Sequence, residues 1–219
     1  MGAVYLLRHG QASFGTADYD VLSPTGHLQS KLLGAELRRR EVPVHAVWSG
    51  TLRRQLATAA ECLRCCPQID VEVRRDPRWN EYDHIGLVPE GQVVDPAGSA
   101  RRFQRLLDDA LRVWLEDGTV AGGSGTWAEF SGGALSALDD VFDDLPRGAS
   151  ALVFTSAGVI GAVCARLLNV PPAGYLALNR TMANASITKL VRGRSGVSLL
   201  SFNEHAHFEG PHRDLLSYR

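Results

Sequence analysis

The sequence predicts an α/β fold, a three-layer sandwich in which helices flank a mainly parallel sheet and a helical insertion covers the ligand-binding edge. Apolar runs of strand length alternate with helical patterns, as in parallel sheets. The clearest runs end in polar turns, where α/β proteins place their ligand crevice. The chain has 219 residues, 45% of them hydrophobic, which suffices to bury one core. We therefore expect a single domain over residues 1–219, with the insertion at residues 83–131.

The first strand is expected at residues 4–8, where an apolar run leads directly into Arg8-His9-Gly10. A buried strand delivers its last residues to the carboxyl edge of the sheet. There, a histidine can act as a nucleophile, an arginine can hold a phosphate or carboxylate, and a glycine lets the backbone approach a bound anion. A motif of only three residues also occurs by chance in unrelated sequences, so the triplet alone is equally compatible with a histidine that has a structural role.

A helix is expected after the loop that follows this strand. Ser23 is the predicted N-cap and Pro24 the first helical residue. The helix continues through Leu28 and Leu32 to Arg38-Arg39-Arg40, a basic run that suits a helix C-terminus.

A second strand, at residues 45–49, leads through a tight turn into a helix with Arg53 and Arg54 in its first turn. Arginine is poorly placed against the positive end of a helix dipole unless an anion offsets its charge. Both arginines are therefore candidates for contact with an anionic ligand.

The alternation of strands and helices is interrupted in the predicted insertion. A helix with one apolar stripe is expected at residues 98–116, followed by a glycine-rich loop at residues 118–125. The next helix opens at Thr126, where Glu129 completes a capping box. The insertion is compatible both with a plain helical hairpin that closes the core and with a cover over a ligand site.

Several pieces of the chain occur in the order of a known pattern: Leu7-Arg8-His9-Gly10-Gln11, Leu22-Ser23-Pro24-Thr25-Gly26 with Gln29, Ser49-Gly50-Thr51-Leu52-Arg53-Arg54 with Thr58-Ala59, Trp79-Asn80-Glu81, residues 152–160, and Asn203 with His207. Over about residues 4 to 208, the chain resembles the histidine phosphatase family, also called the phosphoglycerate mutase-like family. The resemblance implies that His9 is phosphorylated during turnover and that Arg8 and an arginine of the second motif hold the phosphoryl oxygens. The spacing to Thr58 favours Arg54 over Arg53 for that role.

The chemistry of phosphomonoesters agrees with these side chains. Such an ester carries close to two negative charges, and an imidazole cannot attack the phosphorus until fixed donors spread that charge. Two guanidinium groups supply planar, bidentate donors that keep their charge. This chemistry requires no metal, and the sequence contains no P-loop, EF-hand loop or His-Glu-x-x-His pattern. We expect no cofactor and no metal.

Hydrolysis also needs an acid for the leaving oxygen and a base for the attacking water. The resemblance implies Glu81 for both, with Asp83 and Glu90 as reserves, and His84 as another side chain that could face the site. The alternative for Glu81 is a loop carboxylate without a catalytic role.

Two positions depart from the family pattern. Ser156 follows a predicted strand at residues 151–155 and stands where the family has a second active-site histidine, while Gly15 stands where its mutases usually carry an asparagine. A serine hydroxyl donates one hydrogen bond but brings no positive charge. Ser156 therefore fits either an active subgroup variant or a disabled relative. Substrate contacts are expected from Arg8, Arg54 and Ser156, and from the nearby Gln11 and Ser13.

Composition excludes several other classes. A net charge of -1 argues against a general nucleic-acid or anionic-membrane binder. No stretch approaches a membrane span or a secretory signal, so we expect a cytoplasmic protein. Cys62 and Cys65 are assigned to helix packing in preference to a metal or redox role. His205, His207 and His212 have no clear set of partner ligands for a metal.

The sequence thus predicts a phosphatase that hydrolyses a small phosphomonoester through a phosphohistidine on His9. Phosphoryl transfer of the phosphoglycerate mutase type is the alternative among enzymes. A phosphate-binding or regulatory protein with weakened turnover is the alternative outside them, and it rests on Ser156 alone. The expected partner is a small phosphorylated substrate, with no nucleic acid and no membrane, and the oligomeric state is left open.

Overall fold

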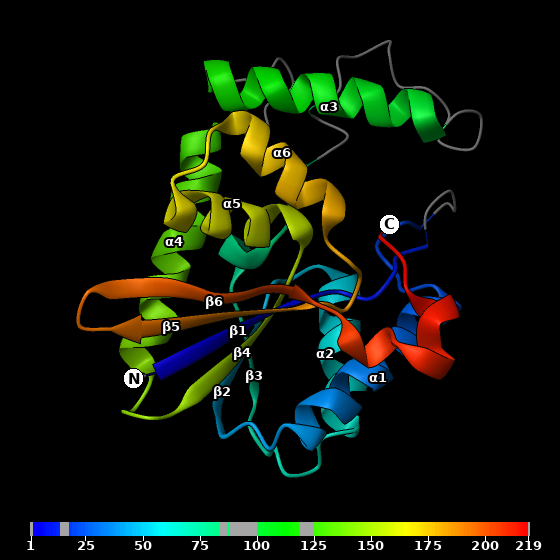
Figure 1. The fold of residues 1–219 in the computed structure, drawn as a ribbon, viewed down its shortest axis with the longest axis vertical. Coiled ribbons are helices and arrows are strands. Elements are labelled where there is room, and N and C mark those ends of the chain that lie inside the picture. Colours follow the sequence, from blue (N-terminus) through cyan, green and yellow to red (C-terminus); the bar gives the residue numbers. More distant parts are fainter. Residues whose placement is uncertain (1, 14–17, 84–86, 88–99, 119–124, 219) are drawn as a thin grey trace.

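The sheet of the protein has six strands in the order β3-β2-β4-β1-β5-β6 in the computed structural model, which describes residues 2–13, 18–83, 87, 100–118 and 125–218. Neighbours from β3 to β1 pair in parallel, β5 is antiparallel to β1, and β6 is antiparallel to β5. Among these strands only β5 therefore runs against the others (Figure 1). The strands are β1 (Gly2–Arg8), β2 (Val44–Ser49), β3 (Val73–Arg75), β4 (Ser150–Thr155), β5 (Ile187–Gly193) and β6 (Gly196–Glu204).

Helices cover both faces of the sheet, which confirms the predicted α/β class. Val4 and Leu6 of β1 pack with residues of α4 and α5, while Tyr5 and Leu7 pack with residues of α1 and α2. Successive residues of a strand point to opposite faces, so β1 is buried on both sides and reads as a continuous apolar run. The helices are α1 (Pro24–Arg39), α2 (Arg53–Arg64), α3 (Ala100–Asp117), α4 (Trp127–Asp144), α5 (Ala157–Leu168) and α6 (Pro172–Thr181).

The start of α1 is the one predicted. Ser23 is the N-cap, and its hydroxyl accepts the Gly26 N–H at 3.0 Å. Leu33 and Leu37 of this helix enter the core, whereas Leu28 is 48% exposed.

The predicted insertion forms α3 and the beginning of α4. The capping box is present, since Thr126 Oγ1 accepts the Glu129 N–H at 3.1 Å and Glu129 Oε2 accepts the Thr126 N–H at 2.8 Å. Helix α3 lies across α6 (Figure 1). The rings of Trp114 on α3 and Phe130 on α4 lie 5.5 and 5.8 Å from that of Tyr82. The insertion thus packs on the residue that follows Glu81.

Two further expectations concern the membrane and the cysteines. Among the residues that the structure describes, no helix combines the length and the apolar character needed to cross a membrane. The four cysteines are free thiols, and Cys62 and Cys66 are buried in the core beneath α1 and α2.

Candidate active site

The carboxyl ends of three neighbouring strands bring the candidate site residues together. Arg8 is the last residue of β1 and pairs with Thr155, the last residue of β4. The His9 N–H donates to the Thr155 carbonyl at 2.9 Å, and Ser156 follows directly. Helix α2 begins at Arg53, four residues after the end of β2. The edge predicted for ligand binding therefore carries both motif arginines and the histidine.

His9 is held as a neutral imidazole with one defined tautomer. Its Nδ1 lies 2.7 Å from the Gly10 carbonyl, and a carbonyl only accepts, so Nδ1 carries the proton. Its Nε2 accepts from Arg54 Nε at 3.2 Å. Burial, together with the positive charges of Arg54 and Arg8, lowers the pKa of His9 well below its ordinary 6.5. The unprotonated Nε2 is therefore the nitrogen with a lone pair for chemistry.

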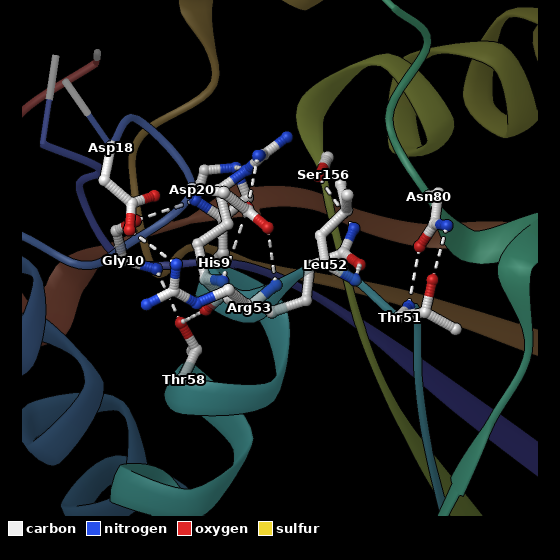
Figure 2. A network of polar contacts seen from close by, with 12 residues as sticks. His9, Gly10, Asp18, Asp20, Thr51, Leu52, Arg53, Thr58, Asn80 and Ser156 are labelled. Atoms are coloured by element: carbon white, nitrogen blue, oxygen red, sulfur yellow. Dashed lines mark hydrogen bonds and ion pairs between the residues drawn. The ribbon is translucent and has the colours of Figure 1, made fainter.

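The two adjacent arginines of α2 point to different places. Arg54 is almost fully buried beside His9, with its guanidinium 5.3 Å from the centre of the Tyr19 ring and its Nη1 donating to Asp20 Oδ1 at 2.7 Å. Arg53 pairs with Asp18 at 2.5 Å in solvent (Figure 2). The structure thus places Arg54 at the histidine and Arg53 away from it. The phosphoryl-holding role that the spacing to Thr58 favours for Arg54 stays a prediction.

Backbone carbonyls anchor Arg8. Its Nη1 donates to the carbonyls of Met182 and Tyr218, the latter at 3.0 Å. The carbonyl of the next residue, His9, accepts from Asn184 Nδ2 at 3.4 Å. Sequence reasoning missed Met182, Asn184 and Tyr218, because carbonyl contacts across so many residues leave no local signal.

Glu81 reaches the site from the segment after β3. Its two carboxylate oxygens accept the N–H groups of Gly158 at 3.1 Å and Tyr82 at 3.2 Å. Burial raises the pKa of Glu81. The hydrogen bond from the Gly158 N–H and the positive charge of Arg54 act in the opposite direction, and their combined effect is smaller. A Cβ on residue 158 would lie 2.0 Å from Glu81 Oε1, so only glycine allows this approach.

Gly10 and Thr58 tie the histidine loop to the neighbouring helices. Thr58 Oγ1 accepts the Gly10 N–H at 3.0 Å and donates to the Arg54 carbonyl at 2.8 Å. A Cβ on Gly10 would lie 2.4 Å from the Gly26 carbonyl of α1. The sequence interpretation assigned this glycine to the approach of an anion, whereas the structure explains it by close packing on α1.

Ser156 is fully buried, and its hydroxyl is bound by Gln55 of α2. Gln55 Nε2 donates to Ser156 Oγ at 2.8 Å and to the Trp79 carbonyl at 2.9 Å, while Gln55 Oε1 accepts the Leu52 N–H at 3.3 Å. Because the carbonyl only accepts and the N–H only donates, these partners fix the orientation of the amide. The Gln55 amide therefore fills the space next to Ser156. The proposed contact of Ser156 with substrate stays a prediction.

We expect Ser156→His to destabilise the protein without raising its activity. An imidazole at this buried position needs volume that the Gln55 amide occupies, and overpacking a core costs about 1–3 kcal/mol. Thermal unfolding and kcat/KM with an aryl phosphate measure both effects. A second variant that also carries Gln55→Ala tests the steric cause, because it removes the amide. A gain in turnover of orders of magnitude in the single variant would instead identify the chain as a disabled relative.

The remaining predicted site residues lie along the segment that leads to α1, directly after Tyr82, or outside the described residues. Gln11 Oε1 accepts the Ser23 hydroxyl at 2.8 Å, and the Ser13 N–H donates to the Val21 carbonyl at 2.9 Å. Substrate contacts by Gln11 and Ser13 stay predictions. Asp83 is exposed. The described residues do not include Gly15, His84, Glu90 or residues 119–124 of the glycine-rich loop.

Two histidines of the last segment, His207 and His205, contact backbone carbonyls. His207 Nε2 lies 3.1 Å from the Ala185 carbonyl, and burial lowers the pKa of His207 to about 4. His205 Nδ1 lies 2.5 Å from the Asn203 carbonyl. Within the described ranges, histidine, cysteine and acidic side chains do not gather in threes as a metal site requires.

The comparison with known families agrees with this geometry. The family model of the histidine phosphatase superfamily (branch 1) matches residues 4–205, so the chain belongs to that superfamily.

Solved structures share the fold at low sequence identity. A phosphoserine phosphatase mutant from Entamoeba histolytica is 19% identical, with a TM-score of 0.67 over 94% of this chain and 99% of that chain. A mycobacterial glucosyl-3-phosphoglycerate phosphatase is 22% identical, with a TM-score of 0.67 over 93% of this chain and 99% of that chain. A phosphoglycerate mutase from Bacillus anthracis is 17% identical, with a TM-score of 0.66 over 94% of each chain.

Proposed function

We propose that the protein is a phosphatase that hydrolyses a small phosphomonoester through a phosphohistidine on His9. The observation that carries this proposal is the neutral His9, whose unprotonated Nε2 lies 3.2 Å from the Arg54 guanidinium at the same sheet edge as Arg8. A neutral imidazole is a nucleophile, and two fixed guanidinium groups offset the charge of a phosphoryl dianion.

The reaction proceeds in two steps. In the first, Arg8 and Arg54 hold the phosphoryl oxygens, His9 Nε2 forms a bond to phosphorus, and the ester P–O bond breaks. Glu81 gives its proton to the leaving oxygen, a role that suits a carboxyl whose pKa is raised by burial. In the second step the Glu81 carboxylate takes a proton from water, the water oxygen bonds to phosphorus, and the P–N bond breaks. Free phosphate leaves and His9 returns to its neutral form.

A small phosphorylated metabolite is the proposed substrate class. Two of the proteins that share the fold are named as phosphatases of phosphoserine and of glucosyl-3-phosphoglycerate. Their names support this class for the present chain, although at about one fifth identity the likeness itself is one of fold.

The test is a panel of phosphorylated metabolites and aryl phosphates, assayed for released inorganic phosphate with the purified protein. Release well above the uncatalysed rate is expected for several monoesters. Isomerisation of a phosphoglycerate without phosphate release would indicate mutase-type transfer instead. Binding of phosphate with no turnover of any ester would indicate the regulatory alternative.

We expect Glu81→Gln to separate substrates by their leaving group. Loss of a general acid costs about 10²-fold or more in kcat/KM for an alkyl phosphate, whose alkoxide leaves poorly without a proton. For 4-nitrophenyl phosphate the loss should be far smaller, because the phenolate leaves unaided. Equal losses for the two substrates would contradict the acid role of Glu81.

The pH dependence of the alkyl phosphate reaction gives a second readout of the same variant. Activity falls as pH drops through the pKa of His9, which lies below 6.5, because protonation removes the nucleophile. Activity also falls as pH rises through the pKa of Glu81, which lies above 4.5, because the acid loses its proton. In Glu81→Gln the alkaline fall assigned to Glu81 should disappear while the acidic fall remains, with the same substrate used throughout.

A further inference from the structure

The first turn of α2 already holds an anion, which is the carboxylate of Asp20. Asp20 Oδ2 accepts the Arg53 N–H at 2.8 Å, and Asp20 Oδ1 accepts from Arg54 Nη1 at 2.7 Å (Figure 2). The Arg54 N–H lies 3.5 Å from Oδ1. Amides at a helix start and a guanidinium group are the donors that bind phosphoryl oxygens. The arginines of this turn predicted an anion here, and the chain supplies one itself.

The same arrangement engages the nucleophile. While Asp20 holds Arg54 Nη1, Arg54 Nε donates to His9 Nε2 at 3.2 Å. A lone pair that accepts a hydrogen bond is directed at its donor and not at a phosphorus atom. The structure therefore represents a resting arrangement that must change before His9 can attack.

Exposure shows which partner of the ion pair can move. The Arg54 side chain is 6% exposed and lies against the Tyr19 ring, whereas the Asp20 side chain is 30% exposed. Turning the Asp20 carboxylate into water costs little, because it is already partly hydrated. Moving the buried guanidinium into water would break its contacts with His9 and Tyr19 together.

We infer that Asp20 is an internal counter-ion that stands in for the phosphoryl group between turnovers, and that the phosphoryl group of the substrate displaces it from Arg54. The inference rests on the proposed function. The exchange replaces one anion by another on the same donors, so the buried arginine keeps a negative partner throughout. It also makes Asp20 a competitor of the product phosphate, which favours product release.

The test measures anion binding in variants that remove the charge and keep the helix cap. Asp20→Asn and Asp20→Ser both retain an oxygen that can accept the Arg53 N–H, since both residue types cap helices. Each should bind inorganic phosphate and orthovanadate about tenfold more tightly than the native protein in calorimetric titration, which corresponds to about 1.4 kcal/mol. Asp18→Asn is the control, because it removes a carboxylate that pairs with the exposed Arg53 guanidinium, and it should leave both affinities unchanged. Thermal unfolding of each variant establishes that it is folded.

The outcomes separate this inference from the proposed function. If the native protein hydrolyses monoesters and binds phosphate, but both neutral variants bind phosphate no better, then Asp20 is no competitor and the inference alone is wrong. If neither the native protein nor any variant binds either anion, both proposals are wrong. Tighter binding in Asp20→Asn and Asp20→Ser, but not in Asp18→Asn, supports the inference even where no substrate has been found.

Discussion

His9→Ala is expected to abolish turnover, lowering kcat/KM by at least about 10⁴-fold, the scale seen when a nucleophile is removed from a catalytic group that acts as a unit. The loss should be chemical, because Arg8 and Arg54 keep their charges and their other partners. Phosphate or vanadate binding should therefore persist in the variant. Steady-state kinetics and a calorimetric titration of the same preparation check both halves of this expectation.

The covalent intermediate can be sought directly in the native protein. Rapid quenching with a labelled, well-hydrolysed ester should trap phosphate on the protein through a P–N bond, which acid cleaves and base leaves intact. No label should be trapped in His9→Ala. Label that survives acid, as on a serine ester, would show that a different nucleophile operates and would overturn the proposed mechanism.

Arg54→Ala is expected to lower kcat/KM by about 10²- to 10³-fold, because it removes a buried charge-assisted donor that acts on the transition state. Its neighbour Arg53 is the matched control, since it has the same charge on the same turn but faces solvent. Arg53→Ala should change kcat/KM far less. Equal losses would mean that the orientation of the first turn of α2 differs from the one described here.

Local patterns predicted much of the fold. The continuous apolar run before Arg8 predicted a buried strand, and β1 is buried on both faces. Ser23 and Thr126 each lie at the helix start that their capping chemistry indicates. The buried face of α1 could not be predicted in this way, because an apolar residue such as the exposed Leu28 does not by itself specify which side of a helix meets the sheet.

Only the site residues that belong to a recognisable sequence motif could be predicted. The juxtaposition of His9 and Arg54 follows from two strand ends at one edge and from the spacing to Thr58. By contrast, Asp20 at the start of α2 and Gln55 beside Ser156 act through contacts with residues distant in the sequence. An aspartate in a polar loop has many plausible surface roles, and only the folded chain shows which donors it meets.

The anchoring of Arg8 has a consequence for when its contacts can form during translation. The Tyr218 carbonyl that binds the Arg8 guanidinium is 210 residues further along the chain, so it leaves the ribosome long after β1. A nascent chain can pair β1 with β4 before that carbonyl has left the ribosome. The Arg8 guanidinium can therefore reach this partner only after all six strands described above have been synthesised.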